Sequence, residues 1–256
     1  MTAVAPTHSF TRTHRAPVHR IGATVRIHVA NPWTTLISPW LILLVVFGLN
    51  FAIWHLVLMA AGDRGVEADA FHYNGGVSWI VFYMVVVAVQ AMNQTFSFVV
   101  GLGATRRDYF VGTSALFAGL ALMYGIGVSV LAGVERATSG WGVNGWFFAP
   151  GPFATMPLWE VAVTYTLVLL FMFFVGSGVA AVFVRWGATG ILTFFASVAV
   201  LLLATLWAIT QADAWASVGH FFTARSPLEL ALLSLPLSLV GGLVGYGLMR
   251  RATPKG

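Results

Sequence analysis

The chain has 256 residues, of which 59% are hydrophobic and only 8% are charged. A soluble domain carries about 25% charged residues, so this composition excludes a soluble globule and predicts a protein whose solvent is lipid. The sequence contains no cysteine, which excludes disulfides, iron–sulfur clusters and thiol chemistry. The net charge of +5 raises nucleic acid as a partner, but the placement of the basic residues, described below, gives a better explanation.

Six stretches are long and apolar enough to cross a bilayer, whose core of about 30 Å takes roughly 20 helical residues. We therefore expect an all-α polytopic membrane protein whose transmembrane domain fills residues 39–250. The six predicted spans are 40–61, 77–102, 110–134, 161–184, 188–209 and 228–249. The apolar run of the first is too long for a cleaved signal peptide.

The chain before the first span divides into two parts. Residues 1–16 are predicted to form a basic flexible tail. Residues 17–38 mix basic and apolar side chains in the manner of an amphipathic helix that lies at the membrane interface. A disordered basic leader is the alternative for this segment. At the other end, residues 251–256 are expected to form a cytoplasmic tail.

The charged residues predict how the spans are oriented. One set of tails and loops holds a single acid, Asp108, and ten basic residues: Arg12, Arg15, Arg20, Arg26, Arg106, Arg107, Arg185, Arg250, Arg251 and Lys255. The other set holds three basic residues and seven acids: Arg64, Arg136, Arg225, Asp63, Glu67, Asp69, Glu135, Glu160, Asp213 and Glu229. Basic residues concentrate on the cytoplasmic side, so both termini are predicted to be cytoplasmic. The excess of arginine over lysine is typical of some prokaryotes, and we expect the prokaryotic plasma (inner) membrane.

The predicted cytoplasmic loop between the second and third spans is the most informative segment. Thr105 stands three residues before Asp108, which is the spacing of a capping box at a helix start. Two glycines just before it let the backbone turn sharply. Arg106 and Arg107 would then be displayed on a rigid corner, where a soluble partner can push on two spans at once. An ordinary pair of positive-inside anchors is the alternative.

A resemblance to a known family rests on this loop. The run Gly-Leu-Gly-Ala-Thr-Arg-Arg-Asp-Tyr-Phe-Val-Gly-Thr at 101–113 resembles the coupling segment of bacterial ABC-2-type transporter permeases. The stretch 131–142 and the six-span layout also resemble that group. The resemblance implies the membrane subunit of an exporter, which pairs with a second permease copy or a related permease and with two cytoplasmic ABC ATPase subunits. The residues that fall on the ATPase-coupling segment are Thr105, Arg106, Arg107, Asp108 and Tyr109.

The energy source would have to come from another chain. A phosphate-binding loop of the form Gly-x4-Gly-Lys-Ser/Thr needs a lysine inside the sequence, and the single lysine here is Lys255. We therefore expect no cofactor on this chain, with ATP and Mg²⁺ bound by the partner ATPase.

Polar side chains gather on one face of the second span. Their spacings of three, four and seven residues place them together, at Gln90, Asn93, Gln94 and Ser97. Because lipid offers these groups no hydrogen-bond partner, they either line a polar substrate path or bond to neighbouring helices. Asn50 and His55 in the first span are candidates for the same path, although a lone histidine in a span is more often structural.

Small residues recur at every fourth position in two spans and predict close helix packing, within one chain or across a dimer. In the third span they are Ala121, Gly125, Ser129 and Gly133. In the sixth they form two series, Ser234, Ser238 and Gly242 in one and Gly241 and Gly245 in the other. The aromatic loops 135–157 and 210–227 are predicted to cap the bundle at the lipid headgroups.

Searches for catalytic patterns find no His-Glu-x-x-His, no Gly-x-Ser-x-Gly and no clustered metal ligands in the sequence. We therefore expect a non-catalytic membrane subunit without a metal of its own. Two other functions stay open: a stand-alone secondary transporter or channel, and a non-transporting scaffold or sensor subunit. The apolar interior favours a hydrophobic or amphipathic cargo such as a drug, a peptide or a lipid.

Overall fold

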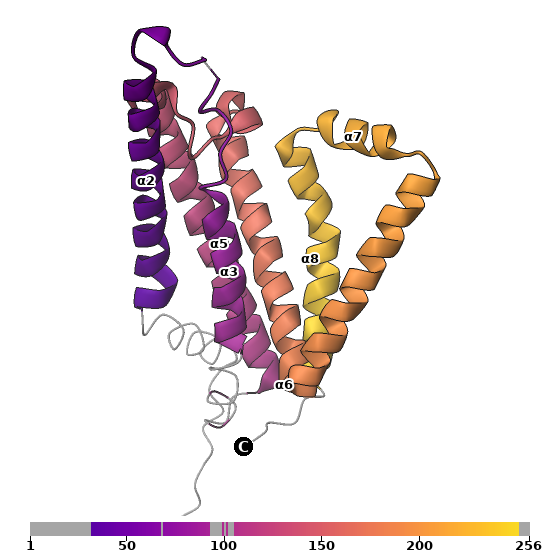
Figure 1. The fold of residues 1–256 in the computed structure, drawn as a ribbon. Helices are drawn as coiled ribbons and strands as arrows, with labels where there is room; N and C mark the ends of the chain where they lie inside the picture. Colours follow the sequence, from indigo (N-terminus) through magenta and orange to yellow (C-terminus); the bar gives the residue numbers. More distant parts are fainter. Residues whose placement is uncertain (1–31, 68, 93–98, 100, 102–104, 251–256) are drawn as a thin grey trace, which may run out of the picture.

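The computed structural model describes residues 32–67, 69–92, 99, 101 and 105–250. The regular structure of these residues is entirely helical. The main helices are α2 (Ser38–Ala61), α3 (Ser78–Gln90), α5 (Arg106–Ala137), α6 (Leu158–Gln211), α7 (Trp215–Thr223) and α8 (Pro227–Arg250). Short helical turns lie at η1 (Trp33–Ile37), η2 (Gly62–Arg64), η4 (Gly140–Asn144) and η5 (Gly151–Thr155). In Figure 1 the long helices run roughly side by side, and α7 lies across one end.

Four helical stretches have the length and hydropathy needed to cross a membrane. They are Trp33–Arg64, Arg106–Ala137, Leu158–Gln211 and Pro227–Leu248, while the apolar helix α3 is shorter. The chain is therefore an all-helical protein with several apolar helices, as expected for a multi-pass membrane protein. Of the second predicted span, 77–102, the structure describes only the part up to 92 together with residues 99 and 101.

Helix α6 is divided in two by one glycine. Its 54 residues would measure about 80 Å as a straight helix, far more than the roughly 30 Å of a bilayer core. Gly187 has φ 68° and ψ −154°, a combination that is essentially restricted to glycine. Figure 1 shows α6 turning back sharply, so that its first and second parts form a hairpin. The turn falls between the predicted spans 161–184 and 188–209.

The first helix begins earlier than the predicted start at residue 40. The π-helical turn η1 continues directly into α2, so Pro39 lies inside a helix and not at its beginning. A proline inside a helix leaves carbonyl groups of the preceding turn without a donor. Two tyrosines supply donors instead: the Tyr124 hydroxyl donates to the Thr35 carbonyl (2.7 Å) and the Tyr83 hydroxyl donates to the Thr34 carbonyl (3.1 Å). This part of the predicted interfacial segment is therefore held against α3 and α5, and the remainder, 17–31, lies outside the described residues.

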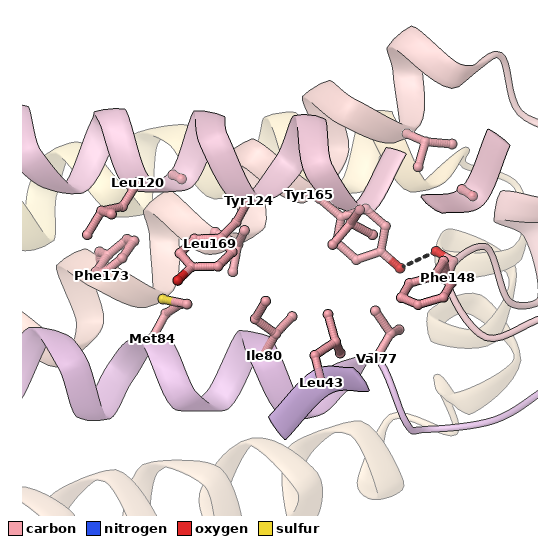
Figure 2. Packing of buried hydrophobic residues seen from close by; sticks show 14 of the residues in the cluster. Leu43, Val77, Ile80, Met84, Leu120, Tyr124, Phe148, Tyr165, Leu169 and Phe173 are labelled. Atoms are coloured by element: carbon pink, nitrogen blue, oxygen red, sulfur yellow. Dashed lines mark hydrogen bonds between the residues drawn. The ribbon is translucent and has the colours of Figure 1, made fainter. Parts of the chain in front are cut away.

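The main core lies between α3, α5 and the first part of α6, with α2 packed beside it. Figure 2 shows Ile80 and Met84 of α3 facing Leu120 and Tyr124 of α5, with Phe173 of α6 at one end. These five side chains are at most 5% exposed. Because burial involves three helices at once, this part of the bundle forms one continuous packed unit.

The second part of α6, together with α7 and α8, packs much less tightly. Large side chains along 192–207 are exposed, among them Leu201 at 66% and Trp207 at 67%. Figure 1 shows this part of α6 diverging from α8 toward α7. Helix α8 starts with a complete capping box, since the Ser226 hydroxyl accepts from the Glu229 N–H (3.2 Å) and the Glu229 carboxylate accepts from the Ser226 N–H (2.9 Å).

Candidate functional site

The corner at the start of α5 has the predicted cap. Thr105 is extended (φ −74°, ψ 150°), and its hydroxyl accepts a hydrogen bond from the Asp108 N–H over 3.1 Å. The Tyr109 N–H closes the first helical turn on the Thr105 carbonyl (3.0 Å). The first turn of α5 is thus fixed by a side-chain cap, as the spacing of Thr105 and Asp108 predicts.

Tyr109 joins this corner to the neighbouring helix. Its side chain is fully buried, and its hydroxyl donates to the carbonyl of Ala91 just beyond α3 over 2.7 Å. It belongs to a small cluster of buried residues near the ends of α3 and α5 and the middle of α6: Met92, Val99, Tyr109, Ala180 and Ala181. Leu248 of α8 packs against that cluster. Tyr109 therefore connects the first turn of α5 to three other helices.

Arg106 and Arg107 occupy the first two positions of α5. Arg107 is exposed and Arg106 is partly exposed. A cation at a helix N-terminus is disfavoured by the helix dipole, whereas the Asp108 carboxylate in the same turn is favoured by it. Arg107 also lines a cavity with Phe110 and Ser114 of the same helix.

The predicted polar path is only partly within the described residues. Gln90 is exposed at the last position of α3. Asn93, Gln94 and Ser97 lie outside the described residues, so their face stays a prediction. Of the four side chains of the second span predicted to line the path, the structure places only Gln90.

The two candidates on α2 are not joined to Gln90. Asn50 is half-buried and its side-chain amide donates to the Val46 carbonyl one turn earlier (2.9 Å). His55 is exposed. Across the part of the chain that the structure describes, no hydrogen bond links Asn50 or His55 to Gln90.

The small residues of α5 lie against α6. A Cβ added to Gly125 would come within 2.2 Å of the Thr166 hydroxyl and 2.7 Å of the Ala162 carbonyl. Ser129, one turn on, donates to the Leu158 carbonyl (2.6 Å). Ala121 is fully buried, and Gly133 faces the side chain of Leu158. The close approach predicted for this stripe thus occurs within the chain.

The stripe on α8 is more open. Ser238 is 3% exposed and its hydroxyl donates to the Ser234 carbonyl (2.8 Å). Gly242 lies beneath the ring of Phe174, with 3.1 Å from an added Cβ to the ring, whereas Gly241 has nothing within 4 Å. A Cβ added at Gly245 would lie 3.9 Å from the ring of Phe110. Ser238, Gly242 and Gly245 are buried and Gly241 is partly exposed, so most of this stripe is covered within the chain.

Glu135 is a site residue that the sequence reasoning missed. Charge counting placed it among the acids of one face, but its side chain is fully buried near the end of α5. Its carboxylate accepts four hydrogen bonds: from the N–H groups of Phe147 (2.7 Å), Phe148 (3.1 Å) and Ala149 (3.0 Å) and from the Trp141 indole (2.9 Å). A buried carboxylate needs such donors. The short spacing to a Gly- and Trp-rich loop is the only sequence signal of this arrangement.

That loop is tied to the segment between α2 and α3. The Trp146 N–H donates to the Phe71 carbonyl (3.1 Å), and the Gly151 N–H donates to the His72 carbonyl (2.8 Å). The Asn74 amide donates to the Trp146 carbonyl. The two loops thus form one cap over this end of the bundle, which we name the Glu135 cap after the carboxylate that holds residues 147–149.

Two cavities lie along the helices. The larger, of about 420 Å³, follows α6 around its turn and is lined by Val182, Trp186, Thr189, Gly190, Thr193, Phe194 and Ser197. The smaller, of about 360 Å³, lies between α5 and α8 and reaches Arg107. Both volumes fall at the low end of the range of ligand pockets, about 300–1,000 Å³.

Within the described residues, no group of three or more His, Cys, Asp or Glu side chains is arranged to hold a metal ion. Comparison of the chain with protein-family models, with curated proteins and with solved structures finds no match.

Proposed function

We propose that this protein is the membrane-spanning permease subunit of an ATP-driven transporter of the ABC-2 type, with ATP hydrolysed on separate cytoplasmic subunits. In this proposal α2, α3, α5, the two parts of α6, and α8 make six crossings of the prokaryotic inner membrane, with both termini in the cytoplasm. A second permease copy or a related permease completes the transport unit.

The single observation that carries the proposal is the linkage through Tyr109. A partner that pushes on Arg106 acts on a capped and rigid helical turn. Tyr109 passes the displacement to α3 through Ala91 and to α6 and α8 through the buried cluster around it. One contact surface on the outside of the bundle can thus move several helices at once, which is the requirement for alternating access driven from a soluble motor.

The lining of one surface cavity supports a proposal for the class of cargo. The larger cavity combines the aromatic rings of Trp186 and Phe194 with the hydroxyl groups of Thr189 and Thr193. Such a lining suits a hydrophobic or amphipathic molecule. We propose export of a compound of that kind.

The experiment co-expresses the chain with the ATPase encoded beside it in its source genome and reconstitutes the pair in liposomes. The expected results are copurification, ATPase stimulation by the wild-type chain, and loss of most of that stimulation in Arg106→Glu. The matched control is Arg225→Glu, which reverses an exposed charge just before the start of α8, at the end of that helix away from Arg106. This variant should stimulate the ATPase normally.

Two outcomes would contradict the proposal. If no ATPase copurifies with the chain or is stimulated by it, the protein is not a subunit of such a transporter. If a proton gradient alone drives uptake into liposomes without ATP, the protein is a secondary transporter instead.

A further inference from the structure

The groove between α5 and α8 combines an apolar wall with a cation at one end. Its lining comes from one face of α5, one face of α8 and a single ring of α6: Arg107, Phe110, Val111, Ser114, Phe174, Ser238, Leu239, Gly242, Leu243 and Tyr246. We name it the α5–α8 groove. The α5 positions are spaced by three and four residues, so they form a single stripe along the helix.

The groove has a buried floor and exposed edges. Ser238 is 3% exposed, and the absence of a side chain at Gly242 leaves the ring of Phe174 uncovered. Leu239 and Leu243 are 67% and 71% exposed. In a membrane these edges would face lipid, so a lipid chain can enter the groove from the side without passing through the protein.

The charge at the end of the groove is positive. Arg107 lies in the first turn of α5, where the helix N-terminus adds its own partial positive charge. Two arginines stand against one acid, Asp108, in this turn. An anion at this position is attracted by both the guanidinium group and the helix end, and basic pockets between membrane helices favour anionic lipid headgroups.

We propose that the α5–α8 groove is a binding site for an anionic phospholipid. The phosphate lies against the Arg107 guanidinium group, and one acyl chain lies along Phe110, Leu239 and Leu243. The apolar length of the groove favours a lipid over free phosphate, which would leave that wall empty. The volume of about 360 Å³ suits a segment of one chain. This inference separates Arg107 from Arg106 and does not depend on an ATPase.

The test uses the full chain, purified in detergent and delipidated. Native mass spectrometry counts bound lipid after addition of phosphatidylglycerol, phosphatidylcholine or inorganic phosphate, and a thermal melt follows stability in parallel. Two variants probe the site from different sides. Arg107→Gln removes the charge, and Val111→Trp fills the groove from its exposed edge.

The matched control is Arg185→Gln, which removes a partly exposed charge that packs over the Trp186 ring, outside the α5–α8 groove. Wild type and this control should retain one phosphatidylglycerol molecule more tightly than phosphatidylcholine. Arg107→Gln should bind it about tenfold more weakly, the size of one charge-assisted hydrogen bond. Val111→Trp should also bind it more weakly, because the added ring occupies the place of the acyl chain.

Three results would overturn the proposal: equal retention of the two lipids, unchanged phosphatidylglycerol binding in both groove variants, or equal stabilisation by inorganic phosphate. None of these readouts depends on transport. The lipid-site proposal can therefore fail while the permease proposal stands, and the permease proposal can fail while the lipid-site proposal stands.

Discussion

The hydroxyl of Tyr109, in the first turn of α5, donates a 2.7 Å hydrogen bond to the carbonyl of Ala91, just beyond the end of α3. The donor is fully buried, so this hydrogen bond joins the two helices away from solvent. In Tyr109→Phe the ring still fills the cluster, but the Ala91 carbonyl loses its donor.

We expect Tyr109→Phe to lower the free energy of unfolding by about 1 kcal/mol, measured as a shift of the thermal melt in detergent. The matched control is Tyr73→Phe at a side chain that is 75% exposed, which should change little. Equal melts for the two variants would show that the hydroxyl does not hold the corner.

The Thr105 cap is tested by a pair of substitutions. Thr105→Ala removes the acceptor of the Asp108 N–H and should reduce stability by about 1 kcal/mol. Thr105→Ser keeps a hydroxyl at the same position and should restore most of it. Chemical denaturation monitored by circular dichroism measures both, and a serine variant as unstable as the alanine variant would contradict the capping role.

Glu135 predicts the largest effect of a single substitution. Glu135→Gln replaces one of the two acceptor oxygens with an N–H₂ group that would face backbone donors, so we expect a loss of about 3 kcal/mol. The change should also loosen the Glu135 cap, seen as faster hydrogen exchange at Phe147–Ala149. Glu67→Gln, at an exposed carboxylate, is the control, and similar stability of the two variants would refute the anchoring role.

Close packing between α5 and α6 is tested with two glycines of the same helix. An added Cβ at Gly125 would overlap Thr166 and the Ala162 carbonyl, whereas Gly119 has nothing within 4 Å. Gly125→Ala should destabilise the protein by about 1–3 kcal/mol. Gly119→Ala should be neutral or stabilise by up to about 1 kcal/mol through helix propensity. The reverse order of melting temperatures would contradict the packing.

The turn of α6 is tested in the same way. Gly187 has open space around it but a φ of +68°, so Gly187→Ala changes conformation and not contacts. We expect a loss of about 1–3 kcal/mol. Gly178→Ala in the first part of α6 also has open space, and its φ is not positive, so it should be tolerated. If the two variants melt alike, the turn does not require glycine.

Hydrophobic length alone predicts where most helices lie, because lipid demands that backbone polar groups be satisfied within each segment. Gly187 breaks α6 between two predicted apolar runs, and each run satisfies its own backbone polar groups as a separate helical segment. The start of α2 could not be predicted, since the helix begins before Pro39 and the carbonyl groups of that turn take donors from Tyr124 and Tyr83 on other helices.

The residues of the candidate site differ in the same way: some follow from local patterns, and others depend on contacts between distant elements. The Thr105 cap is a local pattern of four residues, so the sequence was sufficient. Tyr109 was placed in the coupling segment by resemblance, but its bond to Ala91 depends on how two helices approach each other. Glu135 was assigned to a membrane face by its charge, and its burial depends on a loop whose path no local pattern specifies.

The position of the donors to Glu135 has a consequence for biosynthesis. Phe147, Phe148 and Ala149 follow the carboxylate by only 12 to 14 residues, and loops of about this length close in well under a microsecond. Synthesis proceeds at about 5–20 residues per second. Closure of this loop is therefore not limiting, and the carboxylate can gain its backbone partners once this segment has been inserted. This end of the molecule can be complete before α7 and α8 have been translated.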